Sequence, residues 1–106
     1  MEKTLTFKVD GKEYKLAYTR ETVIATENMG FRIGEIYEKP MASLTYLWRG
    51  AFLEHHDSLT IAEVDGLLGK VKHKGLLDAL LDLYNAPVLT LTDEENEKNA
   101  VEWTVN

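Results

Sequence analysis

Apolar and polar residues alternate along residues 4–18, on both sides of an Asp10-Gly11 step. The apolar positions of this alternation are Leu5, Phe7, Val9, Tyr14, Leu16 and Tyr18. Period-two alternation around Asp-Gly is the strongest short-range signal for a hairpin, because glycine accepts the positive φ of a tight turn. The pattern therefore predicts a β-hairpin over residues 4–18. Since an isolated hairpin is marginal in water, its apolar face must pack on the elements that follow.

From residue 19 onward the apolar spacing becomes helical. Thr19 is a suitable N-cap for a helix that reaches about Met29, and Gly30 is placed to end it. Residues 31–37 are typical of a short helical segment that ends before Pro40, because the residue preceding a proline disfavours the α region. From Met41 the spacing predicts a central helix, broken at residues 58–60. The apolar face of this helix consists of Leu44, Leu47, Trp48, Ala51, Phe52 and His55.

Two further helices are indicated in the second half of the chain. Thr60 and Glu63 form a capping box, which predicts a helix start at that point. A short apolar stripe over residues 61–71 follows. A stronger stripe over residues 76–84 predicts a helix that reaches about Asn85, and Pro87 is expected to stop or kink it. The fold class is therefore α+β and mostly helical, with an N-terminal hairpin and about four to five helices. Residues 1–92 are expected to form one globular domain, with helices in 19–92, and residues 93–106 an acidic C-terminal tail.

The composition agrees with one soluble domain. The chain has 106 residues, of which 44% are hydrophobic and 28% charged, so it has enough apolar surface for one core. It contains no cysteine, which excludes disulfides, thiol catalysis and thiolate metal sites. No leader or membrane-spanning stretch is visible, and a cytoplasmic protein is expected.

The net charge of −6 is concentrated at the C-terminal end. Residues 93–106 contain five acidic residues and one lysine, a net charge of −4. Binding to nucleic acid rests on clustered lysine and arginine, and the one local basic run, residues 70–74, is typical of a solvated loop. The charge pattern therefore argues against a nucleic-acid partner.

His55, His56 and Asp57 are the obvious candidates for a metal site. Consecutive helical residues point about 100° apart, and neither histidine has a suitable ligand at i±4, so this run does not predict metal binding. The serines and glutamates form no recognisable catalytic arrangement. We therefore expect no catalytic, cofactor-binding or metal-binding residue, and a protein that is not an enzyme. The two histidines are expected to end the central helix, where protonatable groups complement the helix dipole.

The terminal segment contains the one candidate for partner binding. Val101, Trp103 and Val105 lie outside the predicted core, beside the acidic run, and exposed aromatic residues often anchor interfaces. The alternative is that the terminus folds back and buries Trp103 on the core. Both interpretations stay open at this level.

Four segments together resemble a known family: FKVDGKEYKLAYTRETV, ENMGFRI, AFLEHHDSLT and LLDALLDLY. The chain is similar over roughly residues 5–92 to the small tail assembly chaperones of siphophages and prophages of Gram-positive bacteria, many of which are known only as a domain of unknown function. The resemblance implies a protein in the bacterial cytoplasm that binds the tail tape-measure protein, and possibly the tail-tube protein, and keeps it soluble before assembly. The alternative is a non-enzymatic structural or adaptor protein of the head-tail or tail. Self-association is compatible with either role.

Overall fold

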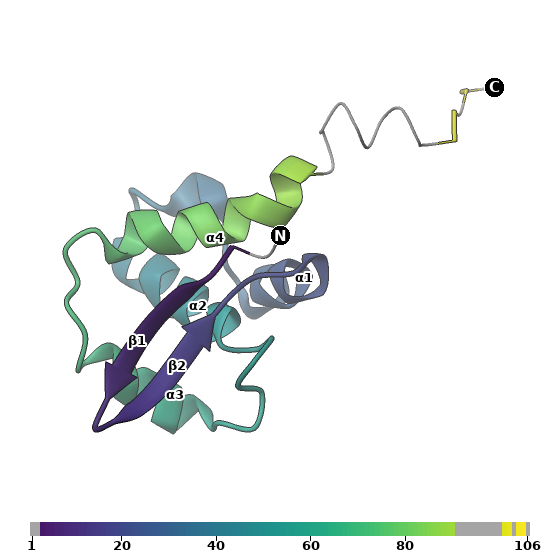
Figure 1. The fold of residues 1–106 in the computed structure, drawn as a ribbon. Helices are drawn as coiled ribbons and strands as arrows, with labels where there is room; N and C mark the ends of the chain where they lie inside the picture. Colours follow the sequence, from purple (N-terminus) through teal and green to yellow (C-terminus); the bar gives the residue numbers. More distant parts are fainter. Residues whose placement is uncertain (1–2, 91–100, 103, 106) are drawn as a thin grey trace.

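The chain folds as a hairpin followed by helices (Figure 1). The computed structural model describes residues 3–90, 101–102 and 104–105. Strands β1 (Leu5–Val9) and β2 (Lys12–Leu16) form an antiparallel pair. The helical elements that follow are α1 (Arg20–Met29), the 3-10 turn η1 (Ile33–Glu35), α2 (Pro40–Ala51), α3 (Ile61–Leu68) and α4 (Leu76–Thr90). The predicted α+β class with an N-terminal hairpin is confirmed.

The hairpin has the register that its alternation predicts. Phe7 pairs with Tyr14 and Val9 with Lys12, and the turn residues Asp10 and Gly11 have φ values of 52° and 81°. Positive φ at both central residues is the requirement of a type I′ turn, which matches the twist of the strands. The inner face of β2 is buried, whereas the inner side chains of β1 are only half-buried.

Helix α2 is the centre of the molecule and packs against α1, α3 and α4 (Figure 1). Trp48 is fully buried, and its ring centroid lies 4.9 Å from that of Phe52 and 5.5 Å from that of Phe7. Its indole Nε1 donates a 2.7 Å hydrogen bond to the carbonyl oxygen of Val64 in α3. One side chain thereby joins the hairpin, α2 and α3.

The contact between α1 and α2 depends on a glycine. Gly50 lies against Thr26 and Tyr18, and a Cβ built on it would stand 2.5 Å from the Tyr18 hydroxyl and 3.0 Å from Thr26 Cβ. The Tyr18 hydroxyl donates a 2.7 Å hydrogen bond to the Leu47 carbonyl, and Thr26 Oγ1 donates one to the Thr22 carbonyl at 2.8 Å. Burial raises the pKa of Tyr18 well above its usual value, so the hydroxyl stays protonated and acts as a structural donor.

Most predicted helix ends are confirmed. Thr19 caps α1, and Gly30 ends it with a φ of 125°. Thr60 and Glu63 form the predicted capping box: Thr60 Oγ1 accepts from the Glu63 amide and Glu63 Oε1 accepts from the Thr60 amide, both at 3.1 Å. The starts of α1 and α3 are local devices, in which a side chain replaces the hydrogen bond that the first helical turn lacks.

Two helix ends differ from the prediction. Helix α2 stops at Ala51, because the next amides turn back to carbonyls three residues earlier: the Phe52 amide bonds to Arg49 and the Leu53 amide to Gly50. Helix α4 does not stop near Asn85 but continues through Pro87 to Thr90. The proline lies in the last turns of a helix whose preceding turns are held by buried leucines, and this packing outweighs the hydrogen bond that proline removes.

Candidate functional site

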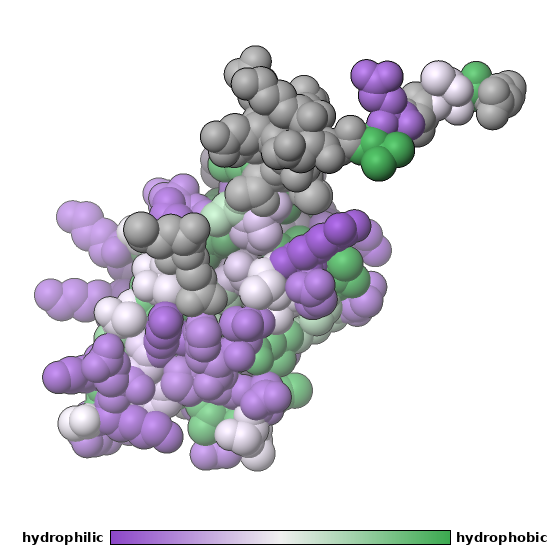
Figure 2. All heavy atoms as spheres, turned by 45° about the vertical axis from the view of Figure 1, so that its right-hand side comes forward, coloured by the Kyte–Doolittle hydropathy of each residue, from purple (hydrophilic) through white to green (hydrophobic). Residues whose placement is uncertain are grey.

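An apolar groove lies between the end of α2, the α2–α3 loop and the start of α3. It has a volume of about 360 Å³. Phe52 and Val64 form its buried floor, while Ile61 is 63% exposed and Met29 38% exposed at its rim. Figure 2 turns the side of α1 and this loop toward the viewer, and hydrophobic areas appear there among hydrophilic surface. The remaining lining residues are Tyr46, Arg49, Leu53, His56, Asp57 and Leu59.

Arg49 closes one side of the groove in a fixed position. Its Nε donates to Asp65 Oδ1 at 3.0 Å and its Nη2 to Asp65 Oδ2 at 2.7 Å. This two-bond geometry orients both groups, and the neighbouring guanidinium lowers the pKa of the Asp65 carboxyl. The pair joins α2 to α3 beside the groove. Ile61, at the start of α3, stays accessible at the rim of the groove.

His56 anchors the α2–α3 loop to the hairpin. Its Nε2 accepts a 3.0 Å hydrogen bond from the backbone amide of Lys15, and its ring packs on Tyr14 with a centroid distance of 5.4 Å. Burial lowers the pKa of His56, and the positive charges of His55 and Lys12 lower it further. A ring nitrogen that accepts an amide proton carries none itself, so the neutral imidazole is the form that fits.

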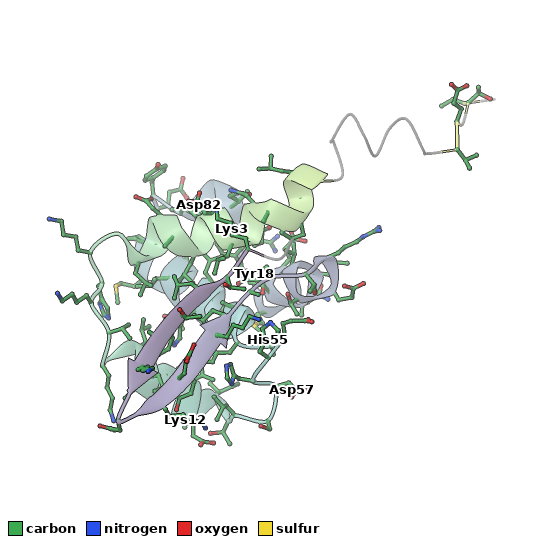
Figure 3. The ribbon with its side chains drawn as sticks, in the orientation of Figure 1. Lys3, Lys12, Tyr18, His55, Asp57 and Asp82 are labelled. Atoms are coloured by element: carbon green, nitrogen blue, oxygen red, sulfur yellow. The ribbon has the colours of Figure 1, made fainter. Side chains whose placement is uncertain are left out.

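The sequence prediction for the two histidines is wrong. His55 is exposed and His56 packs on the hydrophobic core, the reverse of the expected arrangement. Helix α2 ends at Ala51, so the helical spacing on which this prediction rested does not extend to residues 55 and 56. His55 and Asp57 both lie on the α2–α3 loop (Figure 3). Among the described residues, no group of three or more His, Asp or Glu side chains is arranged to hold a metal ion.

We expect the stability of this loop to depend on pH. Because the folded pKa of His56 lies below its unfolded value, its contribution is complete above about pH 6.5 and is lost as the pH falls through the folded pKa. Protonation breaks the bond to Lys15, worth ~1 kcal/mol. Urea unfolding between pH 7.5 and pH 5 should therefore give a falling free energy of unfolding.

Two variants make this expectation specific. In His56→Gln the amide oxygen can still accept the Lys15 proton but does not titrate, so the decline with pH should become shallower. His55→Gln is the matched control and should keep the decline of the unsubstituted protein. An unchanged decline in His56→Gln assigns the pH dependence to other groups.

The predicted partner-binding residues lie at the C-terminal end. Val101 is 91% exposed and Val105 87% exposed, so neither is covered by the described part of the chain. Trp103 lies outside the described residues. Neither valine is among the residues that line the groove.

The groove itself was not predicted from the sequence. Its walls come from α1, α2, the following loop and α3, and of its lining residues only Phe52, Ile61 and Val64 lie on the predicted apolar stripes. Ile61, expected on the buried stripe of α3, is instead the exposed first residue of the helix. An apolar residue directly after an N-cap is a weak signal, since first-turn positions often lie at the edge of a core.

The comparisons with known proteins identify the family. No helix in the described part of the chain is long and apolar enough to cross a membrane. Neither the curated proteins nor the solved structures contain a match to the chain. The model of one family, described as Domain of unknown function (DUF5055), matches residues 1–106. Since this match spans the whole chain, the protein belongs to the DUF5055 family.

Proposed function

We propose that this protein is a phage tail assembly chaperone, which binds an apolar helical segment of the tape-measure protein in the groove between α2 and α3. The observation that carries the proposal is the groove itself, an apolar floor with exposed Ile61 and Met29 at its rim. An amphipathic helix placed in such a groove inserts apolar side chains at i, i+3 and i+4 spacing. The resemblance of residues 5–92 to tail assembly chaperones supports the same role.

The surroundings of the groove fit a protein client better than a reaction. Arg49 and Asp65 neutralise each other across one wall, and His56 is engaged with Lys15. The side chains of Arg49 and His56 are therefore committed to holding the fold. Exposed apolar residues next to a polar rim are typical of protein-binding sites.

Ile61→Asp is expected to weaken client capture at least tenfold without unfolding the protein. Ile61 is the first residue of α3 and 63% exposed, so an aspartate there favours the helix dipole while it places a charge at the apolar rim. Met41→Asp is the matched control, because Met41 is 69% exposed in the first turn of α2 and does not line the groove. The Met41→Asp variant should capture as much client as the unsubstituted protein.

The measurement is co-expression with the tape-measure and tail-tube proteins of the same phage, recording how much of each stays soluble and co-purifies. Soluble tape-measure protein that is lost with Ile61→Asp and retained with Met41→Asp supports the proposal. If both expressed clients stay insoluble and neither co-purifies, the chaperone role is wrong, and an adaptor role becomes the better description. If both variants capture the client equally well, binding occurs outside the groove.

A further inference from the structure

A second pocket lies beside the first turn of α2, at the end of the helix opposite to the groove. It has a volume of about 210 Å³ and lies between the end of α1, the η1 turn and the start of α2. Most of its lining side chains are polar or charged: Arg32, Glu35, Lys39, Ser43 and Tyr46. The proposed function makes no use of this pocket.

The first turn of α2 has no cap of its own. The helix starts from Lys39, whose side chain makes no cap hydrogen bond, whereas threonines cap α1 and α3. Pro40 has no amide hydrogen, and within the described part of the chain the amides of Met41 and Ala42 have no hydrogen-bond partner. Such amides lie at the positive end of the helix dipole, where an anionic group is stabilised.

The buried Ser43 hydroxyl also faces this pocket without a partner. Ser43 is 4% exposed, and its hydroxyl makes no hydrogen bond to any residue that the structure describes. The described residues contain no fully enclosed side-chain oxygen that lacks a partner, so the Ser43 oxygen is accessible from the pocket that it lines. Buried polar groups are normally paired, and an unpaired one indicates a place where a polar ligand fits.

The charge of the pocket is positive. Arg32 Nε lies 3.5 Å from Glu35 Oε1 and Lys39 Nζ lies 3.2 Å from Glu35 Oε2, so two cations share one carboxylate and the net charge is +1. Glu35 occupies only part of the donors of these two side chains, since lysine has three N–H donors and arginine five. Both cationic side chains are largely exposed and can turn toward an incoming anion.

We propose that this pocket binds the carboxylate of an acidic side chain. One carboxylate oxygen accepts from the free amides of Met41 and Ala42, and the other accepts from the Ser43 hydroxyl. Arg32 and Lys39 supply the compensating charge. One carboxylate neutralises the net charge of the pocket, whereas a phosphate group, with a charge of about −2, leaves negative charge uncompensated there.

One source of this carboxylate is a client bound in the apolar groove. Tyr46 joins the pocket to the groove, because its side chain lines both. Ser43 and Phe52 are separated by about 13 Å along α2 at the helical rise. A client helix whose apolar residues fill the groove would thus place an acidic residue in the pocket roughly two to three turns further along. This source rests on the proposed function.

The chain's own acidic tail is the second source. Residues 93–106 contain five acidic residues. Tyr84 of α4 packs on Phe31 of the pocket wall, with ring centroids 5.1 Å apart. Helix α4 ends at Thr90, about 9 Å further along its axis. At up to ~3.6 Å per residue, the acidic residues that follow can reach the pocket. Both sources present the same chemical group.

Amide NMR measures the site on a full-length variant in which the acidic tail residues are changed to Asn or Gln, so that they cannot compete. Sodium acetate, compared with sodium chloride at equal ionic strength, should give saturable shifts of the Met41, Ala42 and Ser43 amide signals. The tail residues changed in this variant are Asp93, Glu94, Glu95, Glu97 and Glu102.

Two substitutions in this background make the test specific. Ser43→Ala removes the hydroxyl at a helical position that alanine favours, and Lys39→Gln removes an exposed charge. Each should weaken acetate binding roughly fivefold. Ser58→Ala and Lys72→Gln, at exposed positions outside the pocket, are the matched controls and should bind acetate as before. Absence of saturable shifts, or equal binding in all four variants, overturns the proposal.

The source of the carboxylate follows from two comparisons. If the chain's own tail occupies the pocket, the Met41 and Ala42 signals of the unsubstituted protein differ from those of the tail variant without acetate. If a client occupies it, Ser43→Ala lowers co-purification of the tape-measure protein about fivefold, and Ser58→Ala does not. If neither comparison shows an effect, the pocket binds only free anions and its assignment to a side chain is wrong.

The same experiments separate this site from the groove. A client that is lost with Ile61→Asp but retained with Ser43→Ala keeps the groove and excludes the client as the source of the carboxylate. A protein that captures no client at all rejects the chaperone role, and the acetate titration and the tail comparison then decide this site alone.

Discussion

Trp48→Ala is expected to remove about 3–5 kcal/mol from the free energy of unfolding, the range for deleting a buried tryptophan. Trp48 is fully buried at the junction of the hairpin, α2 and α3, and packs on Phe7 and Phe52. Its removal leaves a cavity and takes away the donor to the Val64 carbonyl. Since a domain of this size is stable by only about 5–15 kcal/mol, this loss removes a large share of the stability.

Urea unfolding followed by circular dichroism measures this effect, with two comparison variants. Trp48→Phe keeps most of the ring but loses the 2.7 Å bond to Val64, and should cost less, about 1–3 kcal/mol. Tyr37→Ala removes an aromatic side chain that is 98% exposed and should change the free energy by less than about 0.5 kcal/mol. A Trp48→Ala variant as stable as Tyr37→Ala would mean that α2 is not packed as described.

Gly50→Ala is expected to destabilise the protein by about 1–3 kcal/mol or more, although alanine is the better helix former. The added Cβ enters the space occupied by Thr26 Oγ1 and stands 2.5 Å from the Tyr18 hydroxyl. Helices α1 and α2 must separate to admit it, which breaks the hydrogen bonds of Tyr18 and Thr26. The buried hydroxyls would then lose partners that water cannot replace.

Gly66→Ala is the matched control for this prediction. Gly66 lies inside α3, and a Cβ built there meets nothing within 4 Å. Its replacement should stabilise the protein by up to about 1 kcal/mol through helix propensity alone. Thermal and urea unfolding of both variants should thus give shifts of opposite sign. A shift of the same sign in both would show that the α1–α2 contact is looser than the geometry indicates.

The sequence by itself determined the elements whose signals are local. The hairpin follows from alternation around Asp10-Gly11, and the start of α3 follows from Thr60 and Glu63, because each device involves neighbours within a few residues. The place of Trp48 on the buried face of α2 also follows from the periodicity of the sequence. The family resemblance adds a functional expectation to these elements but no location for a binding site.

Only the tertiary structure decided the end of α2, the persistence of α4 through Pro87 and the positions of the histidines. These outcomes depend on contacts between residues far apart in sequence, such as Lys15 with His56, which no local pattern encodes. The same is true of the candidate groove, whose lining residues come from α1, α2, the α2–α3 loop and α3. Packing energy summed over such distant contacts outweighs local preference, so these positions could not be predicted from the sequence.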